Sequence, residues 1–63
     1  MITITRLNDK QIVINADLIL SVESTPDTTI TMTTGLKYIA KESVDDIISN
    51  VLEYRNKIIN FLN

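Results

Sequence analysis

Acidic side chains are the first candidates for chemistry in this sequence. Asp45 and Asp46 are adjacent, and a pair of carboxylates can act as general acid and base. Ser43, however, stands three residues before Asp46, and this spacing is typical of a capping box, in which both side chains bond the backbone at the start of a helix. The other aspartates lie where turns are expected: Asp9, Asp17 and Asp27. The sequence therefore predicts carboxylates that shape the backbone, not a catalytic pair.

The chain contains no cysteine and no histidine. Disulfides, zinc sites built on thiolates or imidazoles, nucleophiles activated by histidine and covalent haem attachment are therefore excluded. With one glycine, the chain also lacks a glycine-rich loop of the kind that binds phosphate groups. We expect a protein without catalytic residues, metal or cofactor, which acts by contact with other molecules and is not an enzyme.

Length and charge restrict the fold and the partners. The 63 residues form a single domain, with 44% apolar residues and a net charge of −2. No apolar run approaches the roughly 18 residues of a membrane span, and no signal peptide opens the chain, so we expect a cytoplasmic protein. Six basic residues in an acidic chain make nucleic acid an unfavourable partner. A domain this small is rarely stable by more than about 3–5 kcal/mol unless it has disulfides, a metal or a partner, which predicts association, as a homo-oligomer or with another protein.

Residues 1–41 show the alternation of apolar and polar residues that is typical of strands. The third strand should place Leu18, Leu20 and Val22 on one face, and Gly35 should supply the positive φ of a tight hairpin turn. We predict an α+β fold, with a small antiparallel sheet or partial barrel of about five strands followed by one helix. The expected strands are 1–7, 11–15, 18–25, 29–34 and 36–41.

The turn at residues 25–28 is a candidate for partner binding. Pro26 suits the second position of a type I turn, and Asp27 suits the third. Turn tips on small sheets are exposed and carry binding more often than the strands do. We therefore predict that Pro26 and Asp27 contact a partner.

The period changes to that of a helix over residues 43–62. Its apolar residues fill about half of the helix circumference, which is more than the usual stripe of about 100° and more than a small sheet can cover. Several of them also follow the alternating spacing of three and four that is typical of contacts between helices. The residues predicted to form an oligomer interface are Val51, Tyr54, Ile58, Phe61 and Leu62.

Arg55 is the single charge near the centre of this apolar face. If it is buried it must meet a carboxylate, because an unpaired buried guanidinium costs several kcal/mol. Glu23, Asp17 or a carboxylate of a second subunit could serve, and Arg55 would then determine partner choice. The alternative is that its aliphatic stem lies along the surface and its head reaches solvent.

Several segments together resemble the FlbD/SwrD family of small flagellar-operon proteins. They are residues 4–8 (ITRLN), 14–19 (INADLI), 23–28 (ESTPDT), 34–35 (TG) and 41–43 (KES). The chain departs from the family pattern at Asp9, where glycine is usual in the first turn. The resemblance implies a cytoplasmic, non-enzymatic protein that supports flagellar motor output and swarming, with motor or stator proteins as partners. It implies no catalytic residues.

A second, shorter resemblance gives the alternative function. Residues 1–6 (MITITR) are similar to the opening of the carbon storage regulator family, small β-rich dimers that bind messenger RNA. The similarity covers the first hairpin alone. The acidic composition and the long apolar helix both argue against RNA binding.

Overall fold

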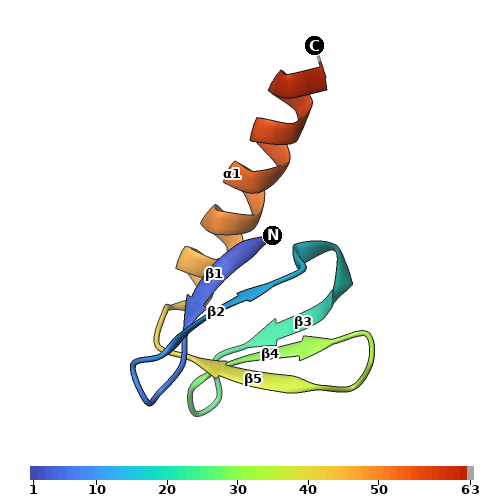
Figure 1. Ribbon diagram of the computed structural model, residues 1–63. Helices are drawn as coiled ribbons and strands as arrows, with labels where there is room; N and C mark the ends of the chain where they lie inside the picture. Colours follow the sequence, from blue (N-terminus) through green and yellow to red (C-terminus); the bar gives the residue numbers. More distant parts are fainter. Residues whose placement is uncertain (63) are drawn as a thin grey trace.

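The computed structural model describes the backbone of residues 1–62 and the side chains of residues 1–58. It contains five short antiparallel strands followed by one long helix, which confirms the predicted α+β fold (Figure 1). The strands are β1 (Ile2–Thr5), β2 (Gln11–Ile14), β3 (Ile19–Glu23), β4 (Thr28–Met32) and β5 (Lys37–Ala40). A 3-10 turn, η1 (Ala16–Leu18), connects β2 to β3, and the helix is α1 (Val44–Leu62).

Strands β1 and β2 form the predicted first hairpin. Ile2 lies opposite Ile14 and Ile4 opposite Ile12, so the alternating isoleucines share one face. Asp9 occupies the tight turn with φ of +67°, in the left-handed region. Aspartate adopts this conformation more readily than most residues, which explains how it stands where a glycine is usual.

Strands β3, β4 and β5 form a three-stranded antiparallel sheet with β4 in the centre. Gly35 has φ of +92° in the β4–β5 turn, as predicted. The Thr25–Pro26 peptide in the β3–β4 turn is cis. The alternation of β4 is as predicted: Ile30 and Met32 are buried.

A β-bulge interrupts the alternation of side chains that was predicted for β3. The register shifts between Ile19 and Ser21, and Leu20 is left 68% exposed. Ile19 and Val22, three residues apart, both pack against the core. The prediction that Leu18, Leu20 and Val22 share one face was wrong, because the extra residue of a bulge turns the side chains that precede it to the opposite face.

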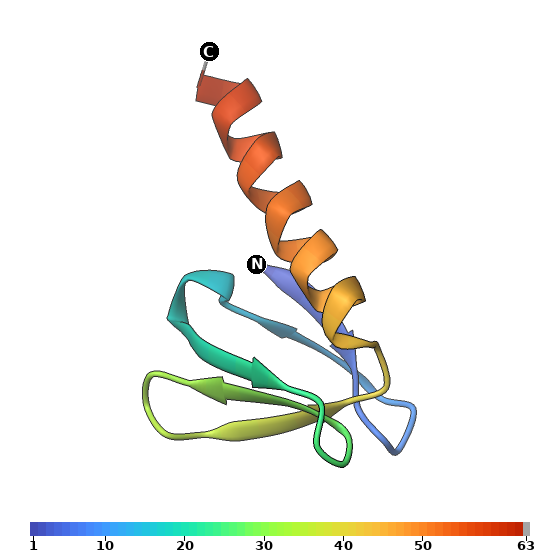
Figure 2. The same ribbon diagram turned by 180° about the vertical axis from the view of Figure 1, so that it is seen from behind.

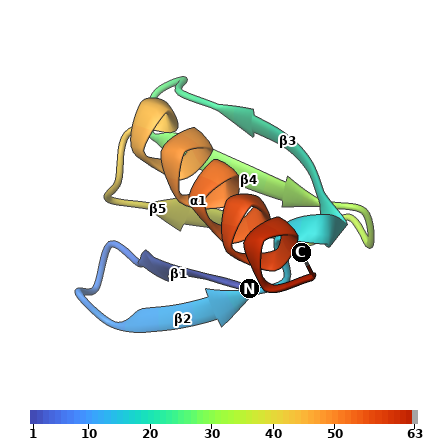
Figure 3. The same cartoon turned by 90° about the horizontal axis from the view of Figure 1, so that it is seen from above.

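The two sheets meet at one corner, where the end of β1 touches the end of β5. Arg6 forms an isolated antiparallel bridge with Ala40, and the N–H of Lys41 donates to the carbonyl of Thr5 at 2.8 Å. The Thr5 N–H in turn donates to the carboxylate of Glu42. The two sheets diverge from this corner, as Figure 3 shows from above.

Helix α1 begins with the predicted capping box. The N–H of Asp46 donates to Ser43 Oγ at 3.1 Å, and the N–H of Ser43 donates to a carboxylate oxygen of Asp46 at 3.4 Å. The helix crosses over the core between β1 and β3, and its C-terminal half extends beyond the sheets (Figures 2 and 3). Ile47 is completely buried, and it joins the core contributed by the strands and η1: Ile2, Ile4, Ile14, Ala16, Ile30, Met32 and Ala40.

Candidate interaction surfaces

A shallow apolar depression lies where the two sheets diverge. Tyr38 on β5 is half-buried and forms part of its floor, together with Met32. Val13 on β2 and Leu36 beside the β4–β5 turn stand at its margin and are 64% and 60% exposed. The depression has a volume of about 240 Å³. Apolar side chains gathered around a recess in this way are typical of a surface that contacts another protein. We call it the Tyr38 surface.

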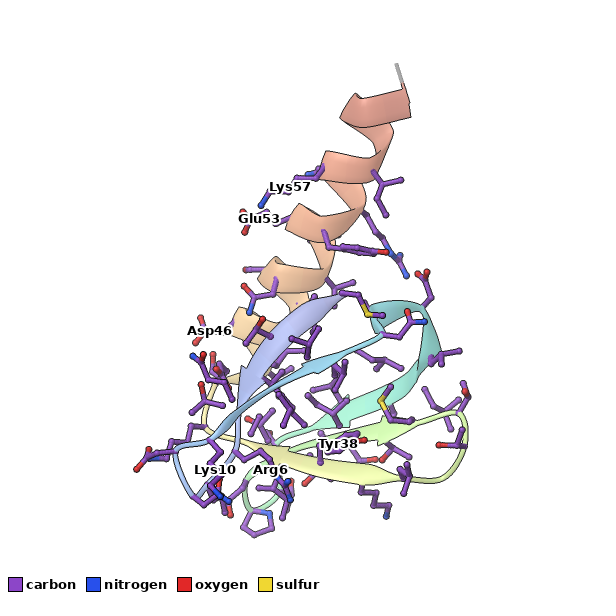
Figure 4. All side chains as sticks on the ribbon, viewed as in Figure 1. Arg6, Lys10, Tyr38, Asp46, Glu53 and Lys57 are labelled. Atoms are coloured by element: carbon purple, nitrogen blue, oxygen red, sulfur yellow. The ribbon has the colours of Figure 1, made fainter. Side chains whose placement is uncertain are left out.

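A second depression with basic residues adjoins the Tyr38 surface and shares its tyrosine. It has a volume of about 340 Å³ and is lined in part by Arg6, Lys37 and the exposed side chains of Leu7 and Ile39. Figure 4 shows Arg6 and Lys10 with Tyr38 at the end of the molecule away from the helix. Apolar and cationic groups therefore lie side by side, and a partner segment that carries both apolar and acidic side chains would complement them.

A third hollow separates helix α1 from β3. It has a volume of about 290 Å³, and Ile19 and Val22 form its strand side. Ile48, Leu52 and Arg55 form part of its helix side. Ile48 and Leu52 are 49% and 54% exposed, so this side of the helix is not covered by the sheets.

The structure places Arg55 on the exposed part of the helix. Among the side chains of residues 1–58, the ion pairs are Lys41 with Asp9 and Lys57 with Glu53, and neither includes Arg55. The guanidinium therefore follows the solvent-exposed alternative and meets neither Glu23 nor Asp17 within the chain. A contact with a second subunit stays a prediction.

The other predicted partner-binding residues lie far from Arg55. Pro26 and Asp27 are exposed at the β3–β4 turn, where the carbonyl of Asp27 accepts a hydrogen bond from Thr29 Oγ1 at 3.2 Å. This turn and the distal half of the helix lie at opposite ends of the molecule (Figure 1). The two predicted contacts therefore belong to separate surfaces.

The residues predicted to form an oligomer interface divide into three groups. Val51 and Tyr54 are half-buried and pack against the core of their own chain. Ile58 is exposed. The side chains of Phe61 and Leu62 lie outside the described residues. An interface at these positions stays a prediction.

Sequence reasoning missed the Tyr38 surface and the role of Glu42. Val13 faces outward in a strand whose inward positions are isoleucine, and an apolar residue on the solvent face was the available signal. Glu42 had no such signal, because its partner, Thr5, is 37 residues away in sequence. Partial burial raises the pKa of Glu42, but the hydrogen bonds from Thr5 outweigh it, so the pKa lies below its usual value of 4.5.

Comparison with known families identifies the chain. A family model described as flagellar and swarming motility proteins, FlbD, matches residues 1–59. The chain belongs to the FlbD family. The match covers all five strands and most of α1. The Tyr38 surface and the hollow between α1 and β3 therefore both lie within the residues that match the FlbD family. Neither the curated proteins nor the solved structures contain a match. Nothing in these comparisons supports the carbon storage regulator alternative.

Within the described part of the chain, α1 does not combine the length and the apolar character that crossing a membrane requires. The same residues contain no group of three or more acidic side chains placed to hold a metal ion together.

Proposed function

We propose that this FlbD-family protein supports the output of the flagellar motor during swarming, and that it acts through protein–protein contacts in the cytoplasm without catalysing a reaction. Its family supplies the link to flagellar and swarming motility. The proposed partner is a protein of the motor or its stator.

The Tyr38 surface is the observation that carries this proposal. Large apolar side chains on a small soluble domain cost solubility, and their concentration around one recess is explained by a partner that covers them. Leu18, Val13 and Leu36 approach this recess from η1, β2 and the β4–β5 turn, so residues distant in sequence build one surface. Arg6 and Lys37 lie beside it, and their charge favours an acidic segment of the partner.

Replacement of Leu36 by serine tests the proposal against a matched control. Leu36→Ser removes apolar area from the Tyr38 surface, while Leu20→Ser removes a leucine of similar exposure from the β3 bulge. In a strain that lacks the native gene, Leu36→Ser should fail to restore swarming and the torque of tethered cells. Leu20→Ser should restore both, and the melting temperatures of both variants should stay within a few degrees of the wild type. Full restoration by Leu36→Ser would show that the Tyr38 surface is not the motor contact.

Binding to RNA at several salt concentrations tests the alternative function. Tight RNA binding that weakens steeply with added salt would support a translational regulator, because such a slope reports contacts with phosphate groups. No binding to RNA, together with a motor-torque defect on deletion, would support the motor function.

A further inference from the structure

The exposed side of helix α1 carries a self-complementary pattern of charges and apolar residues. Asp45, Ile48, Leu52 and Arg55 follow one another at spacings of three, four and three. At about 100° per residue these four positions lie within a sector of about 80°, so they form one stripe along the helix. All four side chains are exposed. We call this set the Asp45–Arg55 stripe.

The stripe is symmetric about residue 50. Suppose that two copies of α1 lie antiparallel, with residue 50 of each helix at the same level along the pair. Ile48 of one helix then faces Leu52 of the other, and Asp45 faces Arg55. Each contact occurs twice, as a two-fold axis requires. We propose that two copies of this chain associate through an antiparallel pair of α1 helices, with two Ile48–Leu52 contacts at the centre and an Asp45–Arg55 ion pair at each end.

Charge selects this arrangement over a parallel pair. In a parallel pair Asp45 would face Asp45 and Arg55 would face Arg55, and like charges at an interface oppose association. Among residues 1–58 of its own chain, Arg55 forms no ion pair. The antiparallel pair would give Arg55 a carboxylate partner from the second chain. At about 100° per residue, the Lys57–Glu53 pair lies outside the sector of the stripe and takes no part in the contact.

The surroundings of the stripe leave room for a second helix. Ile48, Leu52 and Arg55 border the hollow between α1 and β3, whose other side is formed by Ile19 and Val22. A helix seated on the stripe would cover these half-buried residues as well. The contact would bury less surface area than the interface of a permanent dimer, so the dimer should dissociate on dilution. This inference concerns self-association and does not depend on the proposed motor function.

A charge-exchange series tests the arrangement by sedimentation equilibrium. The wild type should pass from monomer to dimer as its concentration rises into the high micromolar range. Asp45→Lys and Arg55→Glu each place like charges together twice, and each should weaken the dimer by about tenfold or more. The double variant restores opposite charges in the antiparallel pair and should recover most of the wild-type affinity.

Two controls keep the test decisive. Glu53→Lys and Lys57→Glu make the same changes in net charge away from the stripe and should leave the dimer unchanged. An equimolar mixture of the Asp45→Lys and Arg55→Glu chains should form a heterodimer, because each charge then meets its opposite. Circular dichroism checks that every variant keeps its helix.

A wild type that stays monomeric at all concentrations, or single variants that dimerise as the wild type does, would overturn the proposal. Failure of both the double variant and the mixture to recover the dimer would overturn the antiparallel pairing.

Discussion

The backbone N–H of Thr5 donates to both carboxylate oxygens of Glu42, at 2.9 and 3.0 Å, across 37 residues of sequence. Thr5 is the last residue of β1, and Glu42 lies between β5 and the helix. Next to this contact, the N–H of Lys41 donates to the carbonyl of Thr5. Both backbone groups of one residue are therefore satisfied by the segment that leads into α1, and this holds the helix over the corner where the two sheets meet.

Replacement of Glu42 by alanine should lower the free energy of unfolding by about 1–3 kcal/mol, because it removes a charged acceptor and leaves the Thr5 N–H without that partner. Glu42→Gln keeps one acceptor oxygen and should cost less. Urea unfolding at pH 7 measures both values. Equal stability of all three proteins would show that the Glu42 contact adds nothing to the fold.

The pH dependence of stability should also report Glu42. Its pKa is lower in the folded protein than its usual value of 4.5, so the folded state favours the charged form. The resulting stability is fully present above that usual value and is lost as the pH falls through the lowered pKa of the folded state. The difference in stability between wild type and Glu42→Gln should therefore shrink in acid. A difference that stays constant from pH 7 to pH 3 would contradict this.

Truncation of two neighbouring isoleucines on the helix should change the stability of the domain by very different amounts. Ile47 is completely buried, so Ile47→Ala should cost about 2–5 kcal/mol and leave most of this small domain unfolded. Ile48 is exposed, so Ile48→Ala should leave the stability of the dilute monomer nearly unchanged and weaken self-association. Thermal unfolding of dilute samples and sedimentation of concentrated ones separate the two effects.

The β3–β4 turn provides a test of the second predicted contact. Asp27→Lys should abolish support of motility and leave the melting temperature within a few degrees of the wild type, because Asp27 is exposed and its described hydrogen bond uses the backbone carbonyl. Asp17→Lys makes the same change at another exposed turn and should restore motility. If Asp27→Lys loses its fold as well, the turn has a structural role alone.

Arg55→Leu should keep the domain folded, since the guanidinium is exposed and forms no ion pair among residues 1–58. It should change the assembly, because the partner's carboxylate would lose its cation. Sedimentation and swarming assays are the measurements. If mass, assembly and motility all match the wild type, Arg55 is a surface side chain without a role in specificity.

Local patterns in the sequence predicted the elements well, because each strand and the helix have a regular period. The capping box at Ser43 and the hairpin glycine at position 35 were found from spacing and residue type alone, and the structure confirms both. The bulge at Leu20 left no such pattern, so the prediction that Leu18, Leu20 and Val22 share one face was wrong. A register shift depends on the partner strand, which the sequence of β3 does not reveal.

The candidate surfaces were harder to predict, because they join residues that are distant in sequence. The Tyr38 surface combines β2, η1 and the β4–β5 turn. Arg55 was placed on the correct face of the helix, but its exposure depended on how far the sheets extend beneath α1. The periodicity of a helix shows which residues share a face and not how much of that face is covered.

The joint between Thr5 and residues 41–42 also determines when the chain can fold during its synthesis. The first hairpin leaves the ribosome early, but a two-stranded hairpin is only marginally stable in water by itself. Its partners at the joint, Lys41 and Glu42, come 36 and 37 residues after Thr5. The first hairpin therefore cannot complete this joint until the segment that leads into α1 has been synthesised, and closure of the core waits for that segment.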